Sequence, residues 1–142
     1  MVNAKGYNKV LLALPSMKNF EVGILGRTSE GITNDEVLLH LVRNTSNLIT
    51  IYDRCSSVTA NGIAKSFELI YSNKSSKQVS FSLAEAEFSA FAAQLDPSKF
   101  DICPNMIEHR ESGVTLNVKN NDGRCRVEIK HKNAKKVCPC CV

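Results

Sequence analysis

The stretch from residue 113 to residue 132 constrains the fold most, because two alternating arms flank a tight-turn sequence. Apolar and polar residues alternate along residues 113–119 and again along residues 124–132. Between them lies Asn-Asn-Asp-Gly, and Asp-Gly favours the mirror-image turns of β-hairpins. We therefore predict an antiparallel hairpin with one apolar face. Its inward-facing residues are expected to be Val114, Leu116, Val118, Cys125, Val127 and Ile129.

The outer face of this hairpin is expected to be polar and basic. Lys119 ends the first arm, and Arg124, Arg126 and Lys130 alternate along the second arm. Side chains on one face of a strand repeat about every 7 Å. With Glu128 on the same side, the hairpin would therefore present a regular row of basic and polar groups to solvent.

Positive charge is concentrated in the last quarter of the chain. From residue 110 onward, eight Lys and Arg residues outweigh three acids, whereas residues 1–109 contain ten Lys and Arg against eleven acids. The last quarter therefore accounts for the whole formal net charge of +4. Such an asymmetry favours a polyanionic partner, nucleic acid before an anionic membrane surface. The alternative is a solvated basic tail that aids solubility.

Three strands and a short helix are predicted in the first half of the chain. Residues 7–14, 19–25 and 48–52 are rich in β-branched and apolar residues, which favours strands. Residues 34–43 carry apolar side chains at helical spacing after a Thr33–Glu36 capping box, which favours a helix. A buried strand is the alternative for this last segment.

The unit at residues 65–95 predicts a strand, a turn, a second strand and an immediate helix. Alternation along residues 65–71 and again along residues 78–81 indicates two strands joined by a polar turn. Ser82 and Glu85 then form a second capping box, followed by apolar residues at helical spacing.

These elements define the expected fold class and domain organisation. A chain of 142 residues favours one core. Strands outnumber helices and the turns are short, so we predict an α+β fold in which an antiparallel β-sheet packs against one or two helices. Residues 1–132 are expected to form a single nucleic-acid-binding domain, and residues 133–142 a basic, cysteine-rich tail.

Enzyme chemistry has no support in the sequence. None of the three histidines lies in a metal-ligand pair, and the chain contains no nucleophile elbow, no phosphate-cradling glycine-rich loop and no dinucleotide fingerprint. We therefore expect a protein that is not an enzyme and that has no catalytic residues.

The C-terminal Val-Cys-Pro-Cys-Cys-Val is the one segment that suggests a metal. Cys138, Cys140 and Cys141 supply three soft ligands, and zinc requires four. Cys125 or His131 on the hairpin is the natural fourth ligand. The alternatives are an acylated, polybasic membrane anchor or a tail of free thiols. No cofactor is therefore expected, with zinc as the exception.

The expected location is intracellular. No apolar run approaches the roughly 18 residues that span a bilayer, and the first residues lack the long apolar core of a secretory signal. A disulfide framework is therefore not expected among the six cysteines. We expect a cytoplasmic or nucleoid-associated protein and no membrane partner.

Lysines and tyrosines along the unit at residues 65–95 could complete a nucleic-acid surface. Lys and Arg bind phosphates, while unstacked bases stack on aromatic rings. Tyr52 and Tyr71 are the candidate stacking residues, since a phenol tolerates a half-wet position. With the hairpin, the candidate nucleic-acid-binding residues are Lys65, Tyr71, Lys74, Lys77, Lys119, Arg124, Arg126 and Lys130.

A family resemblance rests on the same unit. Ser-Phe-Glu-Leu-Ile-Tyr-Ser-Asn-Lys at residues 66–74 and Val-Ser-Phe-Ser-Leu-Ala-Glu-Ala-Glu-Phe at residues 79–88 resemble the sheet-to-helix passage of whirly-type and transcriptional-coactivator-type single-stranded-DNA-binding proteins. The resemblance implies four-stranded antiparallel sheets each followed by a helix, strand binding across the sheets, and dimers or tetramers. It implies that Lys65, Tyr71, Lys74 and Lys77 lie at the binding face.

The resulting hypothesis is a non-enzymatic protein that binds single-stranded nucleic acid, DNA rather than RNA. It would be a homo-oligomer acting in replication, recombination or transcription, in a phage or virus. The alternative is a protein-interaction or structural factor whose C-terminal cysteine cluster binds zinc or a membrane.

Overall fold

One seven-stranded sheet organises the part of the chain that the structure describes. The structure is a computed structural model that describes residues 12–13, 15–23, 33–53, 56–72 and 77–131. The strand order is β1-β2-β3-β7-β6-β5-β4. The strands are β1 (Met17–Gly23), β2 (Thr45–Tyr52), β3 (Gln78–Ala84), β4 (Phe100–Cys103), β5 (Met106–His109), β6 (Val114–Asn121) and β7 (Arg124–His131). The helices are α2 (Asp35–Asn44), α3 (Ala60–Ser72) and α4 (Glu85–Ala93).

The sheet has a parallel half and an antiparallel half. Strands β1, β2 and β3 run parallel, joined by the crossover helices α2 and α3. Strand β7 pairs antiparallel with β3, and β6, β5 and β4 continue antiparallel to the far edge. The α+β class is therefore confirmed. The prediction of an antiparallel sheet with one or two helices is wrong, because the sheet is mixed and the described chain forms three helices.

The strand predicted at residues 65–71 is helical in the structure. This segment belongs to α3, where Ile63, Phe67 and Ile70 are buried at i, i+4 and i+7. That spacing places all three on one face of a helix. A helix here converts the predicted hairpin into a crossover, and a crossover joins parallel strands. The α3 crossover therefore explains the parallel pairing of β2 and β3, as the α2 crossover explains that of β1 and β2.

The helix predicted at residues 34–43 is confirmed as α2, with a different cap. Asn34 is the N-cap, and its side-chain oxygen accepts a 2.9 Å hydrogen bond from the Val37 N–H. Thr33, the predicted cap, is buried, and its N–H donates to the Asp53 carboxylate at 3.0 Å.

The helix predicted after residue 82 is also present, but it begins later. Ser82 lies within β3 and donates its hydroxyl hydrogen to the Asp53 backbone carbonyl at 2.7 Å. It therefore does not cap α4, which begins at Glu85 without a side-chain capping bond. Both predicted capping boxes are thus wrong in their first residue.

The predicted C-terminal hairpin is confirmed as β6 and β7. Asp122 and Gly123 form the two-residue turn with φ of 50° and 80°, as the mirror-image type I′ turn requires. All six residues predicted to point inward are buried.

The remaining strand predictions have mixed outcomes. The strand predicted at residues 48–52 is the second part of β2, and residues 19–23 belong to β1. Of the strand predicted at residues 7–14, only residues 12–13 are described, and they are not in a strand; residues 24–25 also lie outside the described chain. The small hairpin of β4 and β5 was not predicted, because each strand has only four residues.

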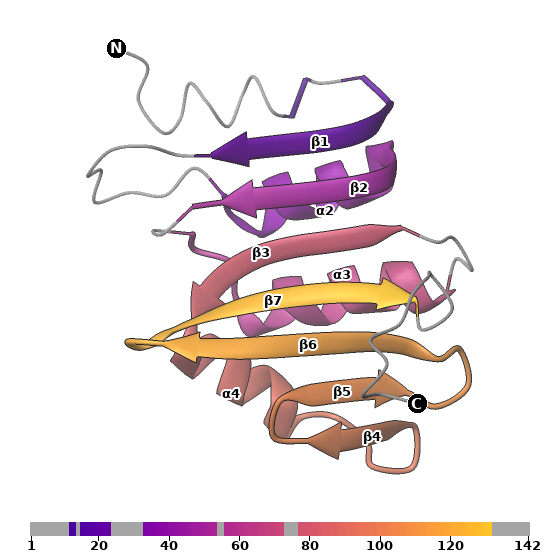
Figure 1. Ribbon diagram of the computed structural model, residues 1–142, viewed down its shortest axis with the longest axis vertical. Helices are drawn as coiled ribbons and strands as arrows, with labels where there is room; N and C mark the ends of the chain where they lie inside the picture. Colours follow the sequence, from indigo (N-terminus) through magenta and orange to yellow (C-terminus); the bar gives the residue numbers. More distant parts are fainter. Residues whose placement is uncertain (1–11, 14, 24–32, 54–55, 73–76, 132–142) are drawn as a thin grey trace, which may run out of the picture.

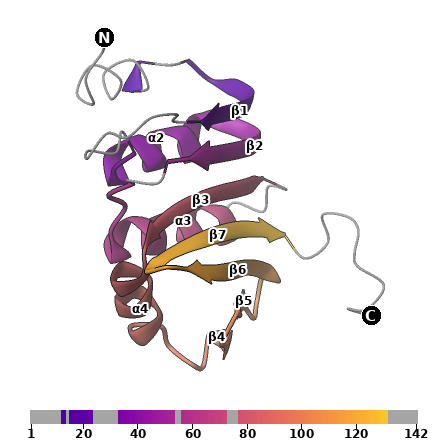
Figure 2. The same ribbon diagram turned by 60° about the vertical axis from the view of Figure 1, so that its left-hand side comes forward.

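All three helices lie on one side of the sheet. Figure 1 shows α2, α3 and α4 behind the strands, and Figure 2 shows the same layer to the left of them. The core between the two layers contains Phe81 and Val127 from the sheet and Phe67 and Phe91 from the helices. The Phe67 and Phe91 rings meet edge to face with centroids 6.3 Å apart, an arrangement that aromatic pairs prefer.

A close contact at Gly62 joins the beginnings of α2 and α3. The Asp35 carboxylate accepts hydrogen bonds from the backbone N–H and the hydroxyl of Thr59, just before α3. A Cβ atom built on Gly62 would overlap this carboxylate. Glycine is therefore required here for close approach rather than for an unusual backbone angle.

Replacing Gly62 by Ala should lower the free energy of unfolding. Alanine gains about 1 kcal/mol of helix propensity over glycine. We expect the displaced Asp35 carboxylate to lose both bonds to Thr59, at a cost of about 2–4 kcal/mol. Urea unfolding should show a net loss of about 1–3 kcal/mol.

The control is the same change in an Asp35→Ala background. There the Cβ meets no carboxylate, so Gly62→Ala should be neutral or stabilising. Equal destabilisation in both backgrounds would show that this contact is not the cause.

Candidate nucleic-acid interface

The sheet face turned away from the helices is the candidate surface. On β3, β7 and β6, buried apolar residues alternate with polar ones, most of which are partly exposed although Thr115 is buried, so the polar set points to the opposite side. No helix of the described chain covers it (Figures 1 and 2). We call this surface the open face. On β3, β6 and β7 it comprises Gln78, Ser80, Ser82, Thr115, Asn117, Lys119, Arg124, Arg126, Glu128 and Lys130, with Tyr52 of β2 beside them. By the same register, three acids nearer the edges of the sheet lie on this side: Glu21 of β1, Glu108 of β5 and Asp101 of β4.

Strand register brings basic residues together on the open face. Arg126 of β7 is paired with Ser82 on one side and with Lys119 on the other. Neighbouring strands lie about 4.8 Å apart, so these three side chains form one row across the sheet. Lys119 is exposed, whereas Arg126 and Ser82 are half-buried.

Arg126 is held against an exposed tyrosine. Its guanidinium carbon lies 4.5 Å from the centre of the Tyr52 ring. One of its terminal nitrogens donates to the Ile51 backbone carbonyl. Burial lowers the pKa of Arg126, while Tyr52 and Glu128 act in the opposite direction. Tyr52 is 55% exposed even so.

Arg124 anchors the start of β7 to the loop after β2. Its Nη2 donates to the Ser56 carbonyl at 3.1 Å and lies 3.5 Å from the Ser82 hydroxyl. These contacts place the guanidinium beside the carboxyl ends of β2 and β3. Ligands of α/β sheets commonly bind at such ends.

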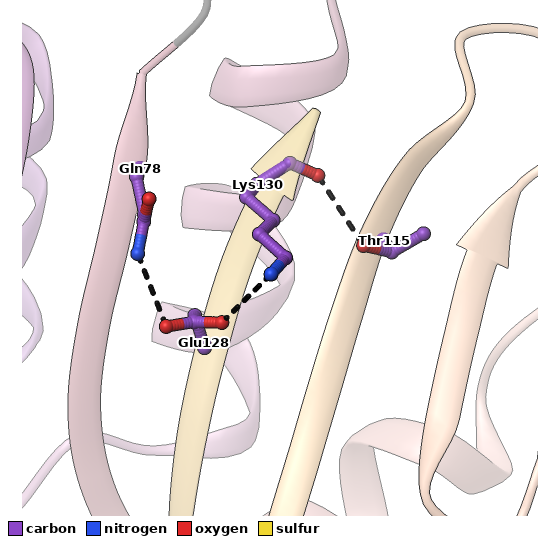
Figure 3. A network of polar contacts seen from close by, with 4 residues as sticks. All are labelled: Gln78, Thr115, Glu128 and Lys130. Atoms are coloured by element: carbon purple, nitrogen blue, oxygen red, sulfur yellow. Dashed lines mark hydrogen bonds and ion pairs between the residues drawn. The ribbon is translucent and has the colours of Figure 1, made fainter. Parts of the chain in front are cut away.

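Lys130 lies in a polar network at the other end of the open face. Figure 3 shows Glu128 between Gln78 and Lys130, with Thr115 beside them on β6. The Glu128 carboxylate accepts from Gln78 at 3.0 Å and pairs with the Lys130 ammonium at 3.3 Å. Both charged side chains are more than one-third exposed, so the pair contributes at most about 1 kcal/mol. An approaching phosphate can therefore compete for Lys130.

Three of the predicted binding residues do not lie on the open face. Lys65 and Tyr71 belong to α3, in the helical layer. Lys77 is only 6% exposed, and its ammonium donates to the Val42 carbonyl at the end of α2. Lys77 comes two residues before the buried Val79, which faces the helices together with Phe81. The alternation of the strand therefore already indicated that Lys77 points to the buried side. The predicted placement of these three side chains on one binding sheet is wrong. Lys74 lies outside the described residues.

Tyr71 belongs to an aromatic cluster instead. Its ring stacks on the His109 ring with centroids 3.7 Å apart and an interplanar angle of 12°. It also meets Phe67 and Phe100 edge to face. The Ser112 hydroxyl lies 2.8 Å from the His109 Nδ1. Tyr71 therefore joins α3 to the strand β5.

The cysteine cluster can be followed only in part. Cys138, Cys140 and Cys141 lie outside the described residues. Cys125 is buried on the helix-facing side, with its Sγ 2.9 Å from the Asn120 side-chain oxygen, and burial raises the pKa of its thiol. Within the described chain, no three His, Cys, Asp or Glu side chains are grouped as a metal site would require. Zinc binding by the tail stays a prediction.

Comparisons with known proteins give no family. No protein-family model, no curated protein and no solved structure matches the chain. The resemblance to whirly-type proteins stays a prediction, and the strand pair on which it rested is a helix followed by a strand. None of the described helices has the length and apolar character needed to cross a bilayer.

The aromatic cluster should make stability depend on pH through His109. Burial lowers the pKa of His109. Lys99 lowers this pKa further, whereas Glu111 raises it. The unfolded chain therefore takes up the proton first, at its ordinary pKa of about 6.5. The stability that the neutral ring contributes is complete above this pH and is lost as the pH falls toward the folded-state pKa.

Urea unfolding on either side of pH 6.5 or so checks this. The wild-type protein should lose more stability on acidification than His109→Gln, which has no ring to protonate. A matched change at His40 provides the control for histidine removal in general. An equal loss in the wild type and His109→Gln would contradict the assignment.

Proposed function

We propose that this chain binds single-stranded nucleic acid across the open face and performs no catalysis there. The observation that carries the proposal is the exposed Tyr52 ring held under the Arg126 guanidinium on an uncovered sheet face. A base can stack on the exposed part of such a ring, and the adjacent guanidinium can contact its phosphate. Base stacking on an aromatic residue contributes about 1–3 kcal/mol.

The basic residues around Tyr52 support the same proposal. Lys119 and Arg126 share one row, and Arg124 lies one step further along β7. Lys130 extends the positive charge along that strand, although Glu128 offsets it locally. Phosphate contacts of this kind are independent of sequence and weaken with salt. We therefore expect binding with little sequence preference.

The sheet geometry favours a single strand over a duplex. Tyr52 can stack only on a base whose face is free, and duplex bases are stacked on each other. In addition, a broad sheet face does not enter a groove as a helix or two-stranded ribbon does. The predicted oligomer and the preference for DNA over RNA stay predictions.

Fluorescence anisotropy with labelled single strands of DNA and RNA, and with the matching duplex, tests the proposal. The wild-type protein should bind a single strand more tightly, with a salt slope of about −0.7 per phosphate contacted. Tyr52→Ala should weaken binding by about five- to a hundredfold at any salt concentration. Lys119→Gln should reduce the slope by about 0.7.

Lys65→Gln is the matched control. Lys65 and Lys119 are both exposed lysines, but Lys65 lies on α3 in the helical layer. Removing its charge should leave the affinity and the salt slope close to wild type. A loss equal to that of Lys119→Gln, or wild-type binding that does not respond to salt, would argue against the open face.

A further inference from the structure

A second basic site lies at the opposite ends of the parallel strands. A pocket of about 500 Å³ is formed where α2 ends and where β1, β2 and β3 begin. The carboxyl ends of the same strands carry Tyr52 and the loop that Arg124 contacts. The pocket is therefore separate from the open-face residues that carry the proposed function. Its polar lining residues include Lys18, Arg43, Asn44, Thr45, Ser46 and Lys77.

The described lining carries three cations and no acid. Lys18 and Arg43 are exposed at the rim, and Lys77 is 6% exposed. Like charges gathered in this way repel each other. The buried Lys77 ammonium also loses solvation. Burial lowers the pKa of Lys77, as expected for an ammonium taken out of water. An anion in the pocket would relieve both costs.

A buried hydroxyl adds an independent indication. Thr45 lines the pocket and is 1% exposed. Its Oγ1 has no hydrogen-bond partner among the described residues. Leaving such a group unpaired costs about 1–3 kcal/mol. A ligand with acceptor oxygens would satisfy this hydroxyl.

Capping of α2 explains only part of this arrangement. The Lys77 ammonium donates to the Val42 carbonyl in the last turn of α2, and a cation at a helix C-terminus is stabilising. One cation suffices for that role, and an ammonium has three donors. The cap accounts neither for Lys18 nor for the Thr45 hydroxyl.

We propose that this pocket binds a phosphate group, either as inorganic phosphate or as the monoester of a small phosphorylated molecule. Lys18, Arg43 and Lys77 would neutralise its charge, and the Thr45 hydroxyl would donate to one of its oxygens. A phosphate dianion matches three cations better than a singly charged carboxylate does. Arg43 can also contact two of its oxygens at once.

Isothermal titration calorimetry of the full chain tests this site. Inorganic phosphate and a phosphate monoester are titrated separately at matched ionic strength, with acetate as the carboxylate comparison. Phosphate should bind and acetate should not. Equal affinity for both phosphates assigns the site to the free ion, and tighter binding of the monoester assigns it to a phosphorylated small molecule.

Variants locate the binding in the pocket. Arg43→Gln should weaken phosphate binding about tenfold or more, because it removes a charged hydrogen bond. Thr45→Val should weaken it by a smaller factor, and Thr45→Ser, which keeps the hydroxyl, should retain most of the affinity. Lys119→Gln removes a lysine of the open face and should bind phosphate as the wild type does.

Three results would overturn the proposal. They are the absence of phosphate binding by the wild type, unchanged affinity in Arg43→Gln, and an equal loss in Lys119→Gln. Because Arg43 is exposed, its substitution tests the site even if Thr45→Val does not fold. Oligonucleotide binding by Arg43→Gln separates this site from the open face, since that binding should be unchanged.

Discussion

Packing of every described helix against one side of the sheet is the constraint on which the rest of the structure depends. Apolar and polar residues alternate along β3, β6 and β7, so the antiparallel half of the sheet has one apolar side. That side must be covered by the helices. Helices α3 and α4 cover that side with Phe67 and Phe91. Burial of large aromatic side chains, each contributing about 1.5–3 kcal/mol, stabilises this arrangement. The other side is left with polar groups, with charged groups of both signs and with Tyr52.

The sequence pattern predicted the β6–β7 hairpin, because this element is determined by interactions between residues close together in the chain. The β6–β7 hairpin follows from alternation and from the positive φ angles that Asp122 and Gly123 adopt. Because its two faces differ, the basic row on the outer side could be predicted as well. Lys119 and Arg126 therefore lie where the sequence placed them. The contact between Arg126 and Tyr52 could not be predicted, because it depends on the order β2-β3-β7 across the sheet.

The errors arose where two periodicities fit the same residues. Phe67 and Tyr71 suit an alternating strand, but Phe67 also continues a helical series that begins at Ile63, before the segment taken as a strand. Choosing a strand at residues 65–71 would place that strand between β2 and β3 in an antiparallel meander, whereas the α3 crossover makes β2 and β3 parallel neighbours. The same choice placed Lys77 on a solvent-facing hairpin. In the fold it lies on the core side of β3, below the end of α2.

The two proposed sites occupy opposite ends of the parallel strands, and the open face is the central claim. Backbone amide shifts of the ¹⁵N-labelled protein, followed by NMR during titration with a single-stranded oligonucleotide at low salt, test that claim most directly. The account predicts shifts that concentrate near Tyr52, on β7 and at the end of β6, while the amides of α3 around Lys65 stay in place. Shifts centred on α3, or no shifts at saturating oligonucleotide, would contradict it.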